Sequence, residues 1–203
     1  MANRIPNIKL LLFILLILFS GEMIFAQTNH IEFGEKSIST SNTGMFFLGG
    51  WAVANIATGA YGWSKYSGQT KYFHQMNLLW NTVNLSIAGI ALYNGLQPDV
   101  VPGTAEEIMA GHNHTMKLLL INSSLDIGYI GTGFLLRHLS SGSEKRADLL
   151  KGYGNSLVLQ GGFLLVFDLC LYGLLRNMKT DYIDGINLSL SHDMAGLGLV
   201  FNF

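Results

Sequence analysis

The sequence predicts an all-α membrane protein, a four-helix transmembrane bundle that follows an N-terminal signal peptide and ends in a short C-terminal β-hairpin. Two observations predict this class. Four separate segments are long and continuously apolar, and only 12% of the 203 residues are charged while 49% are hydrophobic. Because soluble domains carry about 25% charged residues, this composition indicates a lipid environment.

The N-terminus has the layout of a secretory signal peptide. Arg4 and Lys9 precede an apolar run that ends at Phe19, and the small residue Ala26 follows this run. A basic start, an apolar centre and a small residue at the end are typical of a cleavable export signal. We therefore expect residues 1–26 to be a signal peptide, with an uncleaved membrane anchor as the alternative.

Four further segments are long enough to cross about 30 Å of hydrocarbon, since a helix rises about 1.5 Å per residue. Short polar stretches separate them. We expect a transmembrane domain over residues 44–176, between a periplasmic N-terminal segment at 27–43 and a periplasmic C-terminal tail at 177–203. The four expected membrane segments are residues 44–63, 76–96, 116–136 and 153–175.

The charges of the connections predict the orientation of the chain. The first connection carries Lys65 and Lys71, and residues 137–151 carry four more basic side chains. The connection over residues 97–115 contains acidic residues and no Lys or Arg. Because short basic connections stay in the cytoplasm, we expect a multi-pass protein of the bacterial inner (plasma) membrane with both termini in the periplasm. The outer membrane is the alternative location.

The C-terminal tail has a different pattern. Apolar side chains alternate with small or polar ones over residues 186–190 and again over residues 197–203. Alternation at every second residue is strand-like and predicts the β-hairpin within 177–203. The terminal Phe203 after an alternating stretch is also typical of outer-membrane barrels, although barrel strands alternate in polarity and the four apolar segments do not.

Polar side chains recur inside the expected helices. Asn77, Asn81 and Asn84 share one helix face at positions i, i+4 and i+7, and Asn122 and Asp126 share another. Hydrocarbon offers such groups no partner, so we expect them to point inward. The candidate intramembrane polar network or ligand-binding site consists of Asn55, Asn77, Asn81, Asn84, Asn122, Asp126, Gln160 and Asp168.

Asp126 and Asp168 support the sharpest functional hypothesis, because no Lys or Arg lies at their depth in the expected bundle. Each must therefore be protonated or meet a cation or water. One interpretation is a purely structural hydrogen-bond network between helices. The alternative is a small proton- or cation-coupled transporter or channel that uses both carboxyl groups.

Four histidines near the segment ends support a weaker third hypothesis, a metal- or haem-linked membrane protein. His112 and His114 form a His-x-His pair, while His74 and His138 are expected at the opposite membrane edge. Imidazole groups bind zinc and copper, but a His-x-His pair supplies only two ligands. These residues are therefore metal candidates only, and no cofactor is predicted.

Other function classes lack their motifs. The chain has no nucleotide-binding loop, no Ser/His/Asp order and no HExxH motif, and Cys170 is its single cysteine. A net charge of -1 with scattered basic residues is not typical of nucleic-acid binding. We expect a non-enzymatic structural, ligand-binding or partner-binding helical bundle. Its expected partners are the lipid bilayer and either a second copy or another membrane protein.

Two stretches resemble a pattern in uncharacterised small membrane proteins of Bacteroidota-type bacteria. They are GGWAVANI at residues 49–56 and YFHQMNLLWNTVN at residues 72–84. The resemblance covers roughly the first expected helical hairpin. It implies a domain of unknown function, a cell-envelope location and helical architecture, and it implies no activity or functional residue.

Overall fold

The computed structural model describes residues 8–97 and 103–198, with side chains for residues 30–97 and 103–185. The described chain forms four helices, α1 (Ile8–Lys65), α2 (Gly68–Gly95), α3 (Ala105–Ser140) and α4 (Ala147–Gly198). Each expected membrane segment falls on one helix, to within one residue at the end of α2. The prediction of an all-α chain of four long helices is therefore confirmed.

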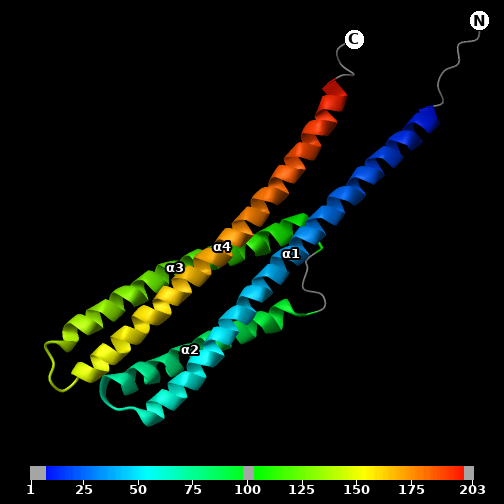
Figure 1. Ribbon diagram of the computed structural model, residues 1–203. Helices are drawn as coiled ribbons and strands as arrows, with labels where there is room; N and C mark the ends of the chain where they lie inside the picture. The colour runs from blue at the N-terminus through cyan, green and yellow to red at the C-terminus, as the bar shows by residue number, and fades with distance from the viewer. Residues whose placement is uncertain (1–7, 98–102, 199–203) are drawn as a thin grey trace, which may run out of the picture.

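The helices alternate in direction (Figure 1). The connection between α1 and α2 and the connection between α3 and α4 lie at one end of the bundle, here named the turn end. Helix α1 begins and helix α4 finishes at the opposite end, the terminal end. Helix α1 packs mainly on α2, α3 packs mainly on α4, and the two hairpins meet chiefly through α2 and α4.

The turn end is closed by direct contact between helix backbones. A Cβ atom on Gly133 of α3 would lie 2.7 Å from the carbonyl oxygen of Gly154 in α4. A Cβ on Gly152 of α4 would lie 2.5 Å from the carbonyl oxygen of Gln69 in α2. Glycine at these positions lets the helices approach closely, as small residues do between membrane helices.

The terminal end is more open. Over the described residues α2 and α3 make no close backbone contact. Helix α3 starts there with a capping box, in which the Thr104 hydroxyl accepts a hydrogen bond from the Glu107 N–H at 3.2 Å and the Glu107 carboxylate accepts one from the Thr104 N–H at 3.3 Å. This cap fixes the beginning of α3 beside the open region.

The described side chains are arranged with polar groups inside and apolar groups outside. Asn81, Ser156 and Gln160 are fully buried. Two or more large apolar side chains on each helix are more than half exposed, among them Phe47 at 64%, Ile90 at 64%, Ile127 at 61% and Val166 at 63%. In water this arrangement would be the reverse of the usual one.

Two of the helices are long and apolar enough to cross a membrane, judged by length and composition. They are α3 and the part of α4 over Ala147–Gly185, which reach mean hydropathies of 1.3 and 1.9. Helices α1 and α2 do not meet the same hydropathy criterion within the described residues. The polar residues that lower the average of α2 are the buried Asn77, Asn81 and Asn84.

The predicted β-hairpin is wrong for the part of the tail that the structure describes. Helix α4 continues to Gly198 through residues 186–190 and 191–194, which were expected to form a strand and a turn. Extending a formed helix needs no new nucleation, whereas an isolated two-stranded hairpin is marginal. Residues 199–203 lie outside the described chain.

The predicted signal peptide and N-terminal segment fall within α1 from residue 8 onward. The helix runs without interruption past Ala26 and through residues 27–43. Secondary structure therefore does not change at the expected cleavage position. Residues 1–7 lie outside the described chain.

The glycine contact at the turn end gives a first prediction. Gly133→Leu should lower the unfolding temperature, because overpacking a closed contact costs about 1–3 kcal/mol. Gly131→Leu is the matched control, since nothing lies within 4 Å of a Cβ at Gly131. Thermal unfolding of both variants in detergent would measure the difference. Equal unfolding temperatures would contradict the close packing of α3 on α4.

Candidate functional site

The Gln160 side chain of α4 lies at the centre of a buried hydrogen-bond network. Its Oε1 accepts a hydrogen bond from Trp51 Nε1 at 3.0 Å. Its Nε2 donates to Asn55 Oδ1 at 3.3 Å and to Asn77 Oδ1 at 3.1 Å. Trp51 and Asn55 belong to α1 and Asn77 belongs to α2, so this one amide joins α4 to both helices of the first hairpin.

The network continues along α2. Ser156 of α4 donates its hydroxyl to Asn77 Oδ1. Asn81 Nδ2 donates to the backbone oxygen of Asn77 at 2.8 Å, and Asn84 Nδ2 donates to Asn81 Oδ1 at 3.4 Å. The residues Trp51, Asn55, Asn77, Asn81, Ser156 and Gln160 are here named the Gln160 seam.

A stacking contact between two aromatic rings holds α1 against α4 beside this seam. The indole of Trp51 stacks on the Phe163 ring of α4, with ring centroids 3.8 Å apart and planes 6° from parallel. The stacking holds the indole plane while its N–H donates to Gln160. The amides of the seam thus satisfy one another, and its role in the fold is to join helices.

A second polar region lies between α2 and α3, toward the terminal end from the seam. It is a cavity of about 220 Å³, here named the Asp cavity. Its polar lining consists of Asn84, Asn122, Asp126 and Asp168, and the rest of its wall is apolar or aromatic. No Lys or Arg occurs among the described residues that line it.

The two aspartates face each other across this cavity from α3 and α4. Asp126 is 3% exposed and Asp168 is 5% exposed. Two carboxylates that are both ionised would repel each other at this position. Asp126 Oδ2 is buried without a hydrogen-bond partner among the described residues.

An aromatic contact closes the Asp cavity on the side of the turn end. The rings of Trp80 in α2 and Tyr129 in α3 meet edge to face, with centroids 4.6 Å apart and planes at 79°. Trp80 lies one helical turn from Asn84, and Tyr129 lies one turn from Asp126. The Trp80 indole N–H is buried and has no hydrogen-bond partner among the described residues.

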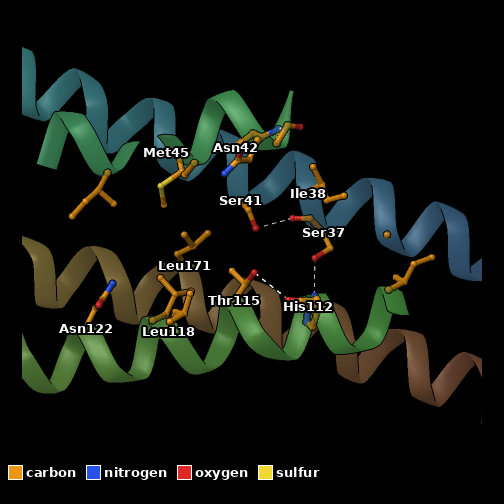
Figure 2. Close-up of a pocket in the computed structure, with 18 of the residues that line it drawn as sticks. Ser37, Ile38, Ser41, Asn42, Met45, His112, Thr115, Leu118, Asn122 and Leu171 are labelled. Atoms are coloured by element: carbon orange, nitrogen blue, oxygen red, sulfur yellow. Dashed lines mark hydrogen bonds between the residues drawn. The ribbon is translucent and has the colours of Figure 1, made fainter. Parts of the chain in front are cut away.

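A larger cavity of about 440 Å³, the outer cavity, continues from the Asp cavity toward the terminal end. The two cavities share Ile87 and Asn122 in their walls, so they adjoin. Figure 2 shows Asn122 and His112 near opposite ends of the outer cavity, with Met45 and Leu171 between them. Together the cavities form a path from the open end of the bundle to the aspartate pair.

The far end of this path is held by a contact between α1, α3 and α4. Ser37 Oγ and His112 Nδ1 are 2.7 Å apart (Figure 2). The Phe33 ring lies 4.9 Å from the imidazole of His112 and stacks on Tyr182 at 4.4 Å. Burial lowers the pKa of His112 from its ordinary 6.5; the Leu175 backbone opposes this shift and the charge of Lys179 adds to it.

The four candidate metal-binding histidines do not come together. His112 is buried against Ser37, whereas His114 and His138 are exposed. The imidazole of His74 stacks on the ring of Tyr66, which lies in the connection between α1 and α2, at 5.5 Å. The described residues contain no group of three or more His, Cys, Asp or Glu side chains that could hold a metal ion.

The structure divides the eight predicted site residues into two groups. The first group belongs to the Gln160 seam and consists of Asn55, Asn77, Asn81 and Gln160. The second group lines the Asp cavity and consists of Asn84, Asn122, Asp126 and Asp168. Asn84 also donates a hydrogen bond to Asn81 of the seam.

The sequence interpretation missed Trp51, Ser156, Trp80 and Tyr129. A search one helical turn away from each predicted polar residue would have found all four. Trp51 and Ser156 lie four positions from Asn55 and Gln160, and Trp80 and Tyr129 lie one turn from Asn84 and Asp126.

A family model, described as a family of unknown function (DUF6992), matches residues 47–169. The matched range includes the whole Gln160 seam and the whole Asp cavity, and it begins after Ser37 and the α1 wall of the outer cavity. No curated protein and no solved structure matches the chain.

The seam gives a second prediction. Gln160→Leu should destabilise the bundle by about 2 kcal/mol, because it removes three buried hydrogen bonds worth about 0.6 kcal/mol each in a membrane protein. Gln97→Leu is the matched control, since the exposed Gln97, just beyond the end of α2, donates to the Tyr93 backbone oxygen and joins no second helix. Equilibrium unfolding in mixed micelles would measure both. A loss in Gln160→Leu no larger than in the control would exclude the seam as a helix-joining contact.

His112 gives a third prediction, for the pH dependence of stability. Because its folded-state pKa is lowered, the unfolded chain binds more protons as the pH falls below about 6.5, and stability decreases there. Wild type should therefore lose more stability between pH 8 and pH 5 than His112→Asn does. The exposed His114→Asn is the control and should behave as wild type. An equal loss in all three proteins, measured by thermal unfolding, would contradict this origin.

Proposed function

The chain belongs to the family of unknown function DUF6992, and from this premise we propose that it is a non-enzymatic integral membrane protein whose four helices enclose a binding site for a small ligand. The observation that carries the proposal is the aspartate pair at the blind end of a path through a bundle with an apolar surface. Carboxyl groups at such a position are costly in a membrane and are kept for function.

The apolar surface supports membrane insertion of all four helices. Side chains that point outward on α1 and α2, such as Phe47 and Ile90, are as exposed and as apolar as those on α3 and α4. The low average hydropathy of α2 comes from asparagines that are buried inside the bundle. In a bilayer every polar group needs an internal partner, and the Gln160 seam meets this requirement.

The positions of the connections support the proposed orientation. The basic turns that carry Lys65 and Arg146 lie at the same end of the bundle (Figure 1), as an inner-membrane protein with periplasmic termini requires. In this orientation the outer cavity opens to the periplasm. Residues 1–26 then act as the export signal or, uncleaved, as an anchor, and the ends of α1 and α4 project beyond the bilayer.

The arrangement does not favour catalysis. Ser37 and His112 form a nucleophile-and-base type of contact at 2.7 Å, but a catalytic serine also needs an orienting acid and free oxyanion donors. Both residues lie inside helices α1 and α3, whose backbone N–H groups are used in helix hydrogen bonds. No carboxylate bonds the imidazole among the described residues. Binding is therefore the better interpretation.

A second candidate function is a small proton- or cation-coupled transporter. The path that ends at the buried carboxyl groups of Asp126 and Asp168 favours it. A transporter would also have to open the contact between Trp80 and Tyr129. The binding function needs no such opening, so we place it first.

Water in the path is the fourth prediction and tests the proposed function. With Cys170 replaced by alanine, Asn122→Cys in lipid nanodiscs should react with N-ethylmaleimide, because the reactive thiolate forms only where water reaches it. Ile121→Cys is the matched control, since the neighbouring Ile121 is 46% exposed on the outer surface and lines neither cavity. It should react far more slowly. Equal rates for the two positions would contradict a water-filled path inside a lipid-surrounded bundle.

A further inference from the structure

The walls of the path carry three acidic side chains, and the one basic side chain among the described residues that line it, His112, is bonded to Ser37. Glu107 lines the outer cavity, Asp126 and Asp168 line the Asp cavity, and no Lys or Arg occurs among the described residues that line either cavity. Asp126 is 3% exposed, and its Oδ2 has no hydrogen-bond partner among the described residues. A buried carboxylate in this state needs a cation or a hydrogen-bond donor.

A bare metal ion does not fit this site. The described residues provide no group of three or more metal-binding side chains. Oxygen ligands must also approach a hard metal ion to about 2.0–2.6 Å, whereas the Asp cavity has a volume of about 220 Å³. The Asp cavity therefore has room for a group larger than a bare ion.

The other residues that line the Asp cavity indicate the chemistry of a ligand that would fit it. Leu48, Val83 and Leu164 provide an apolar surface. The rings of Trp80 and Tyr129 form the closed end of the cavity, and aromatic rings attract organic cations. Carboxylate, aromatic and aliphatic groups are thus combined around one cavity, which is the chemistry that recognises an ammonium group attached to a short apolar chain.

We propose that the Asp cavity binds a small organic ammonium ion, whose N–H groups donate to Asp126 and Asp168 while its apolar part lies against Trp80 and Tyr129. This proposal rests on the ligand-binding function proposed above and names the class of its ligand. The amides of Asn84 and Asn122 supply further polar contacts beside the ammonium group. The ion enters through the outer cavity, past the acidic side chain of Glu107.

Calorimetric titration of the full chain in lipid nanodiscs with n-butylammonium tests the proposal. Wild type should bind n-butylammonium at least tenfold more tightly than the neutral n-butanol. It should also bind it more tightly than tetraethylammonium, which has no N–H group to donate. Equal affinity for the amine and the alcohol, or binding of neither, would overturn the proposal.

The matched variants remove one carboxyl group at a time without changing its shape. Asp126→Asn and Asp168→Asn should each weaken n-butylammonium binding at least tenfold, whereas Asp184→Asn, an exposed change on the same helix as Asp168, should not. Unfolding temperatures identify any variant that fails to fold. Asn122→Trp then provides a second test, because it blocks the junction of the cavities, keeps both carboxyl groups and should also abolish binding. Undiminished binding in the aspartate variants would overturn the proposed site.

An ammonium group can come from a free amine or from the headgroup of phosphatidylethanolamine. Nanodiscs with and without this lipid distinguish the two sources: competition with n-butylammonium indicates the lipid, and no competition indicates a free amine.

The experiments also distinguish failure of this inference from failure of the proposed function. If Asn122→Cys reacts with N-ethylmaleimide but n-butylammonium does not bind, the cavity is real and the ligand class is wrong.

Discussion

In the proposed membrane setting, hydrocarbon offers a buried amide no hydrogen-bond partner, and this constraint accounts for the central contact of the bundle. Gln160 uses both ends of its side-chain amide to bond three residues from two other helices. The same constraint turns the asparagine face of α2 inward and leaves leucine, isoleucine and phenylalanine side chains on the outside. These internal polar bonds act together with close helix packing and with a buried apolar cluster that includes Leu48, Leu119 and Leu171.

The packing of the helices differs between the two ends of the bundle. At the turn end, glycines bring α3 and α4, and α4 and α2, into backbone contact. Helices α2 and α3 make no close backbone contact over the described residues, and the edge contact of Trp80 and Tyr129 spans the gap between them. The two cavities are a consequence of this separation. The aspartate pair lies at the boundary, where the closed half of the bundle gives way to the open half.

Local sequence properties predicted the four helices correctly, and the asparagine face of α2 is buried, whereas Asn122 of α3 is exposed. Length, apolar composition and the spacing of Asn77, Asn81 and Asn84 belong to single segments and need no knowledge of their neighbours. The division of the polar residues between seam and cavity depends on which helices pack together and how each is rotated, and single-segment patterns do not contain this information. Ser156 was missed because a serine in an apolar helix looks like any small residue. The β-hairpin predicted within residues 177–203 was wrong over the described part of that range, because a short alternation of apolar and polar residues also fits a continuing helix.

Lipid contact on all four helices is the central claim, and spin-label accessibility in nanodiscs tests it most directly. Single labels at Phe47, Ile90, Ile127 and Val166 report on the outward face of each helix. The account predicts that all four labels collide with oxygen dissolved in the bilayer and are shielded from a water-soluble nickel reagent. Labels on α1 and α2 that collide freely with the nickel reagent would contradict it.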